Sequence, residues 1–202
     1  MQSTDPPPIT FSPFDLRAAL VFHRVYHASR GIQVNHWVFL PCYLLGVFLA
    51  LTNFWAQMAA YVLLSVYALG LTGRVVGGSY VVFLLSPLLF LAWVLTENLA
   101  NQPAWVPAAT GGGIALASLL LQLVGHAKFE KLKPPPTLMH GLVAAPMLEW
   151  MMVGMECYLA TNPRKPTPTW LFNGIEDVDA EIFDEAERLS KEYEAKFDAL
   201  VI

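Results

Sequence analysis

The segment from His126 to Glu130 places two side chains that can bind a metal ion at the end of a long apolar run. The histidine and the glutamate are four residues apart, which puts both on one face of a helix because four residues make about one turn. A neutral imidazole and a carboxylate are both ligands for divalent metals, so one helix could present them to the same ion. A polar cap where a membrane helix leaves the bilayer would show the same pair, and this pair alone leaves both interpretations open.

All the histidines of the chain lie at or near the ends of expected helices: His23, His27, His36, His126 and His140. His23 and His27 are one turn apart and share a face, whereas His27 and His36 would lie on opposite faces of one continuous helix. Only a break near Gly31 would bring His27 and His36 to one centre. Each histidine alone also fits an interfacial imidazole bonded to backbone, but as a set they predict a centre suited to iron or zinc rather than calcium or magnesium. Its expected members are His27, His36, His126 and Glu130.

The composition places these residues in a membrane protein. Of 202 residues, 55% are hydrophobic and 14% are charged, which is unusual for a soluble domain. The stretch from Gly31 to Gly73 contains no Asp, Glu, Lys or Arg, and Glu97 is the single one between Val75 and Ala127. Such runs exclude loops in water. The sequence also lacks a glycine-rich phosphate-binding loop and a basic patch for nucleic acid, so we expect no nucleic-acid partner.

We expect an all-α, polytopic membrane bundle of four to six hydrophobic helices within a catalytic domain over residues 14–160. A proline-rich lead covers residues 1–13, and an interfacial helix should follow it up to about Ser29. The expected spans are Trp37–Trp55, Gln57–Thr72, Val75–Thr96 and Trp105–Gly125. The first two are predicted to form a tight hairpin, and Gly111-Gly112-Gly113 in the fourth would allow close helix packing.

The C-terminal third of the chain is less uniform. A fifth apolar stretch, Leu138–Ala160, carries Glu149 and Glu156, and it is either a further span or a re-entrant or interfacial segment. A linker over residues 161–175 leads to an acidic amphipathic helix over residues 176–202. That helix would dock on the body or pair with its copy in a homo-oligomer.

The expected spans also predict one side of the membrane for all five histidines. Four spans separate His36 from His126, and an even number returns the chain to its starting side. Most lysines and arginines share that side, whereas the opposite loop holds only Glu97. The positive-inside rule therefore makes the histidine side cytoplasmic.

Three short motifs carry a resemblance to a known family. They are Tyr26-His27, then Asn35-His36 followed by Pro41, and the run from Gln122 to Lys131, which leads into Pro134 and Ala145-Pro146. In these motifs the chain resembles the fungal and bacterial family of endoplasmic-reticulum 2-hydroxy fatty acid dioxygenases, which acts in the breakdown of phytosphingosine. The resemblance covers about residues 14–160, and its most specific part is Gly-His-x-x-Phe-Glu-Lys at Gly125 to Lys131.

The resemblance implies an iron(II)-dependent oxygenase of the endoplasmic reticulum membrane that uses dioxygen to shorten a 2-hydroxy fatty acid, or a similar lipid, by one carbon. This reaction is an α-oxidation. By match, His27, His36 and His126 would be metal ligands and Glu130 a ligand or a group that orients one. Glu130, Tyr26 and His23 are the expected catalytic side chains, and the expected substrate-binding residues are Arg24, Arg30, Glu149 and His140.

Two other functions remain open from the residues. One is a metal-free membrane isomerase or cyclase acting on a hydrophobic metabolite, in which Glu130, Glu149 and the histidines serve as acid and base. The other is a non-enzymatic membrane scaffold whose acidic helix binds a partner. Metal analysis separates the first from an iron enzyme, and deletion of residues 176–202 tests the second.

Overall fold

A computed structural model describes most of the membrane-embedded part of the chain. It describes residues 29–72, 75–129 and 146–150 and the single positions Ala19, His23, His27, Arg188, Lys191 and Glu192. For residues 71, 72 and 75–80 it describes the backbone alone. The described residues fold into helices without a strand. The all-α prediction is therefore confirmed for this part of the chain. The lead and the linker lie outside the described residues, and of the predicted tail helix only Arg188, Lys191 and Glu192 are described, all helical.

Helix α2, Arg30–Ala50, begins earlier than the sequence predicts. Ser29 has an extended backbone, and its hydroxyl accepts a hydrogen bond from the backbone N–H of Ile32 at 3.3 Å, as expected of a helix N-cap. Gly31, where we expected the break, lies inside the helix. The expected break between His27 and His36 therefore precedes Arg30 and lies at the N-cap Ser29.

The first expected span was also wrong at its C-terminal end. The chain turns at residues 51–53, and Trp55 belongs to the next helix, α3, Phe54–Thr72. Thr52 adopts a left-handed backbone with φ of 57°, and the Asn53 side chain accepts from the N–H of Ala56 at 2.9 Å, which caps α3. The remaining helices, α4 at Val75–Asn98 and α5 at Trp105–Phe129, start where predicted and extend slightly further.

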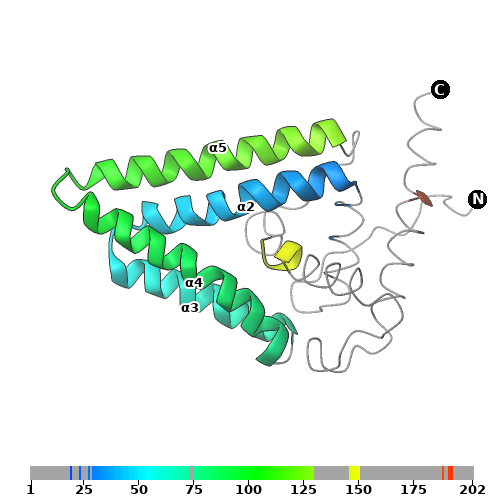
Figure 1. Ribbon diagram of the computed structural model, residues 1–202, viewed down its shortest axis with the longest axis horizontal. Helices are drawn as coiled ribbons and strands as arrows, with labels where there is room; N and C mark the ends of the chain where they lie inside the picture. Colours follow the sequence, from blue (N-terminus) through cyan, green and yellow to red (C-terminus); the bar gives the residue numbers. More distant parts are fainter. Residues whose placement is uncertain are drawn as a thin grey trace, which may run out of the picture.

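Helices α2 and α5 lie antiparallel and in close contact (Figure 1). A Cβ on Gly46 would approach the backbone N of Ala115 at 2.6 Å, and one on Gly111 would overlap the backbone of Ala50. At the other end of the pair, Gly31 packs directly on the ring of Phe129. Small residues thus let the two backbones meet, as in other membrane helix pairs. Gly111 bears out the expected close packing, whereas Gly112 and Gly113 face open space.

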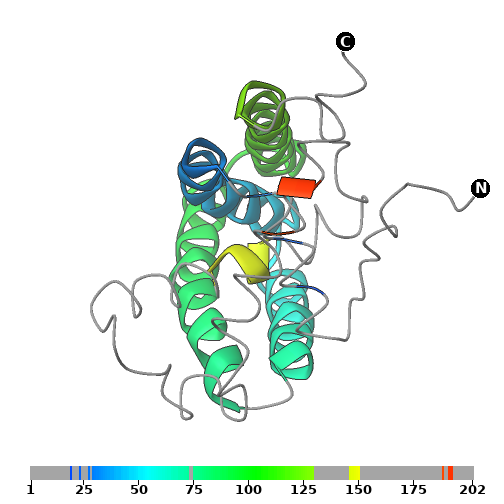
Figure 2. The same ribbon diagram turned by 90° about the vertical axis from the view of Figure 1, so that its right-hand side faces the viewer.

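Helices α3 and α4 form the second pair, side by side and inclined to the first (Figure 1). The predicted α2–α3 hairpin is wrong, because these neighbours in sequence make few contacts and each packs mainly against a later helix. A helical segment at residues 146–150 lies between the pairs (Figure 2). Its Met147, Leu148 and Trp150 join a buried cluster with residues of α2, α3 and α4. This packing positions Glu149.

Three described helices are long and apolar enough to cross a membrane: α2, residues 81–98 of α4, and α5. Large apolar side chains of α5 such as Leu116 and Leu120 point outward, while Ser118 and Gln122 are buried. A helix with an apolar exterior and a small or polar interior suits lipid surroundings. The chain is therefore a helical protein associated with a membrane.

Candidate metal centre

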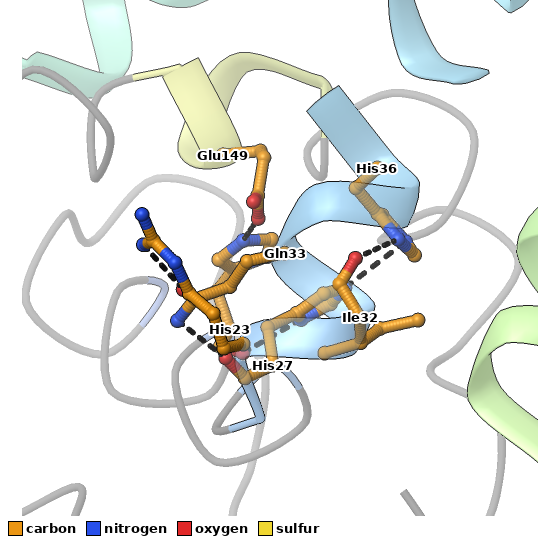
Figure 3. Close-up of polar contacts among 7 residues, drawn as sticks. His23, His27, Ile32, Gln33, His36 and Glu149 are labelled. Carbon is orange, nitrogen blue, oxygen red and sulfur yellow. Dashed lines mark hydrogen bonds and ion pairs between the residues drawn. The ribbon is translucent and has the colours of Figure 1, made fainter. Parts of the chain in front are cut away.

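The centre of the site is a pair of buried imidazoles from either side of the Ser29 cap. His27 and His36 are 1% and 2% exposed, and their Nε2 atoms lie 3.2 Å apart (Figure 3). Two nitrogen ligands about 2.1 Å from one metal ion would be separated by roughly 2.9 to 3.4 Å, depending on the coordination angle. The observed separation lies within that range.

Backbone carbonyls determine which nitrogen of each ring carries the proton. The Nδ1 of His27 lies 2.7 Å from the carbonyl oxygen of His23, and the Nδ1 of His36 lies 3.1 Å from that of Ile32. A carbonyl oxygen can only accept, so both Nδ1 atoms must donate. In the neutral rings both Nε2 atoms then carry lone pairs, and these lone pairs face each other. Such an arrangement is favourable only with a cation between them, either a metal ion or a proton added to one ring.

His126 supplies a third imidazole from the last turn of α5. Its ring centroid is 5.1 Å from that of His27 and 5.0 Å from that of His36, and it is nearly perpendicular to both. One ligand nitrogen from each of the three rings lies within 4.8 Å of the others. His126 is partly exposed, whereas its two partners are buried. Metal-binding histidines typically have their second nitrogen fixed by a carbonyl or carboxylate, as in His27 and His36. The three rings could therefore hold a metal ion.

Gln33 supports the turn that carries His27. Its side chain is 6% exposed, and its Nε2 donates to the backbone carbonyl of His27 at 3.1 Å. Its Oε1 accepts from Nη1 of Arg30 at 3.2 Å, and the guanidinium of Arg30 also lies over the ring of Trp37. These contacts fix the His27 backbone relative to the first turn of α2. Arg30, expected to bind substrate, has its guanidinium on Gln33 and Trp37, although the residue is exposed.

A second cluster lies against the first. His23 stacks on His27 with ring centroids 3.9 Å apart, and its Nε2 is 2.7 Å from Oε2 of Glu149 (Figure 3). Both His23 and Glu149 are almost fully buried. Glu149 is thus a partner of His23, whereas the sequence analysis placed it among the substrate-binding residues. One ligand atom each from His23, His27 and Glu149 lies within 4.8 Å of the others, so this group too could hold an ion.

The structure brings together five of the residues singled out from the sequence: His23, His27, His36, His126 and Glu149. The remaining candidates, except Arg30, lie outside the described residues: Tyr26, Arg24, Glu130 and His140. Sequence reasoning missed Gln33 and the carbonyl of Ile32. The spacing of Gln33 and Ile32 from His36 could have found them, since three and four residues make one turn of a helix.

Comparison of the chain with protein-family models, with curated proteins and with solved structures found no match.

Proposed function

We propose that this protein is an iron(II)-dependent membrane dioxygenase that acts on a 2-hydroxy fatty acid or a similar lipid and shortens it by one carbon. The observation that carries the proposal is the pair of Nε2 atoms of His27 and His36, 3.2 Å apart with both Nδ1 atoms committed to backbone carbonyls. The nearby ring of His126 offers a third ligand nitrogen. Three imidazoles that converge in this way favour a borderline divalent metal over a single shared proton.

The identity of the metal and of the substrate rests on the resemblance of the histidine motifs to 2-hydroxy fatty acid dioxygenases. Iron held by few protein ligands would leave positions for dioxygen and for the hydroxyl and carboxylate of the substrate. The balance requires one dioxygen for each 2-hydroxy acid, with a carboxylic acid one carbon shorter, carbon dioxide and water as products. Glu130 would complete or orient the ligand set.

The other residues of the site would position and shield the reacting groups. Gln33 holds the turn of His27 in place, and the stacked ring of His23 covers one face of His27. Arg30, at the exposed rim, is suited to attract a carboxylate, and Tyr26, Arg24 and His140 remain candidates for contact with the rest of the substrate. A lipid would enter from the bilayer between helices. The resemblance suggests the endoplasmic reticulum membrane as the location. The site should face the cytoplasm, because the sequence puts most lysines and arginines on the histidine side of the expected spans.

The test is metal analysis of the full-length protein purified in detergent without oxygen. We expect about one iron per chain and oxygen consumption on addition of a long-chain 2-hydroxy fatty acid. His126→Ala should insert and remain monodisperse but lose bound iron and more than about 100-fold of the activity, the upper range for disturbing even the surroundings of a metal ligand. His140→Ala, outside the resembling motifs, is the comparison variant and should keep bound iron, with a milder loss of activity. A His126→Ala protein with full iron content and activity would refute the proposal.

A metal-free acid–base enzyme is the second candidate, and a specific observation favours it. The buried pair of His23 and Glu149, 2.7 Å apart, is the arrangement in which a carboxylate orients an imidazole for proton transfer. In that case a chelator would leave activity unchanged while Glu149→Gln abolished it. An iron enzyme should show the opposite response to the chelator.

A further inference from the structure

A cavity of about 340 Å³ lies at the end of the bundle opposite the histidines. The turn between α2 and α3, the C-terminal end of α4 and the first turn of α5 form its walls, through residues such as Thr52, Phe54, Thr96, Glu97 and Pro107. His36 lies near the start of α2 and His126 near the end of α5, so the length of both helices separates this cavity from the metal centre (Figure 1). It therefore requires its own explanation.

Gln57 supplies an unpaired acceptor beside this cavity. Its Nε2 donates to Oγ1 of Thr96 at 2.8 Å, and that hydroxyl donates to the carbonyl of Ala92 at 2.8 Å. Because the hydroxyl proton is committed to Ala92, Thr96 can only accept from Gln57, which fixes the orientation of the amide. The Oε1 of Gln57 is then left buried without a hydrogen-bond partner, and the residue is fully buried. Gln57 is not among the lining residues; it lies behind Thr96 and fixes the hydroxyl of that wall residue.

The electrostatics of the cavity favour a cation. Glu97 lines it, and the C-terminal end of α4, with its partial negative charge, is adjacent. Among the cationic residues whose side chains are described in the bundle, Arg30 and Lys128 lie at the far ends of α2 and α5. Hence the described residues of the cavity wall offer hydrogen-bond acceptors and a negative charge, and none of them is cationic.

Aromatic side chains surround the same end of the bundle. Phe54 lines the cavity and contacts Trp55 and Trp93, with ring centroids 5.4 Å and 6.1 Å away. Trp55 is 78% exposed. Exposed tryptophans at the end of an apolar bundle mark the level of lipid headgroups, and aromatic faces attract organic cations. Thr52, also in the wall, has the left-handed φ of 57° that usually requires glycine, and such residues cluster at ligand sites.

We propose that this cavity binds an organic ammonium group, as carried by the headgroup of a zwitterionic phospholipid. The ammonium would pair with the carboxylate of Glu97, while Phe54 presents its ring. The proposal is independent of the chemistry at the histidines.

Native mass spectrometry of the full-length protein in detergent tests this site. Short-chain phosphatidylethanolamine should bind at least about tenfold more tightly than phosphatidylglycerol of equal chain length, which lacks the ammonium group. Glu97→Gln should weaken that binding about tenfold. Asn98→Gln is the matched control, because Asn98 is exposed, donates to the carbonyl of Val94 and is not in the cavity wall. Phe54→Leu, which removes the aromatic ring from the wall, provides a second variant with the same expected direction.

Competition with free ethanolamine distinguishes the source of the ammonium group. Displacement of the lipid would assign the affinity to the headgroup, whereas binding of the lipid alone, still dependent on Glu97, would show that the acyl chains contribute. Equal binding of phosphatidylglycerol, full affinity in Glu97→Gln, or displacement of the lipid by calcium at micromolar concentration would each overturn the proposal.

Discussion

Two neutral imidazoles that both donate through Nδ1 cannot hydrogen-bond to each other through Nε2. His27 and His36 are held in this state by backbone carbonyls of the residues four positions earlier in the chain, His23 and Ile32. The metal centre is thus prepared by backbone geometry, because a residue four positions earlier orients each ligand. The structure also explains why the chain must break between them, since the Ser29 cap lets His27 face His36 across the start of α2.

For single residues, we predict that Gln33→Leu weakens metal binding although Gln33 is not a metal ligand. The change leaves the buried carbonyl of His27 without its donor, which costs about 1–3 kcal/mol and loosens the turn. Metal affinity, measured by competition with a chromogenic chelator, should fall about 10- to 100-fold, the range for residues that orient ligands. Val34→Leu, an exposed position on the same helix, should leave affinity unchanged. Equal affinities of both variants would show that Gln33 has no part in positioning His27.

The residue types of the site and the meeting of His27, His36 and His126 were predictable, but the pairing of His23 with Glu149 was not. Histidine spacing indicated that a break was needed and which rings would meet, because helical periodicity is local. The contact between His23 and Glu149 joins positions 126 residues apart, and it depends on the packing of residues 146–150 between the helix pairs. Nothing in local spacing encodes that arrangement. Periodicity alone therefore could not distinguish a substrate-binding Glu149 from a partner of His23.

Among the helices, the α2–α5 contact determines whether His36 and His126 can meet. Its closest approach, at Gly46 and Gly111, is far along the helices from the histidines, and Asn35 adds a hydrogen bond to the carbonyl of Leu121 at 3.1 Å. The sequence predicted this role for the glycine triplet, but it could not tell which glycine faces α2. It also predicted a longer first span, because Thr52-Asn53 is a short polar interruption that hydropathy over about 19 residues averages away.

Gly111→Ala and Gly112→Ala form a matched pair that tests this contact. The new methyl group at position 111 would overlap the backbone of Ala50, so the helices must separate, whereas position 112 has nothing within 4 Å. We expect Gly111→Ala to lower the melting temperature in detergent and the bound metal together. Gly112→Ala should keep both or raise the melting temperature, because alanine stabilises a helix by up to about 1 kcal/mol over glycine. Equal behaviour of the two variants would contradict the role of this contact.

For the whole molecule, the arrangement of helices bears on the number of membrane crossings. The start of α2 and the end of α5 lie at the same end of the bundle, which requires an even number of crossings (Figure 1). Helix α3 has 19 residues and is about 28 Å long, close to the thickness of the hydrocarbon core. It lies beside α4 and returns the chain. We therefore predict four crossings, with α3 as the shortest.

Cysteine labelling measures this topology. In a chain with Cys42 and Cys157 replaced by alanine, Lys128→Cys should react with an impermeant maleimide only from the cytoplasmic side, and Asn101→Cys only from the opposite side. The reason is that Lys128 lies in the last turn of α5 beside the cationic start of α2, whereas Asn101 lies in the turn between α4 and α5, beyond Glu97. A third cysteine at Ser29 should label with Lys128→Cys, because Ser29 caps the start of α2 at the histidine end. If Ser29→Cys and Lys128→Cys label from opposite sides, the segments that carry His27 and His126 lie on opposite sides of the membrane. These histidines could then not bind one metal ion. Labelling of both Asn101→Cys and Lys128→Cys from the cytoplasm would put the two ends of α5 on one side of the membrane, so α5 would not cross it and the prediction of four crossings would be wrong.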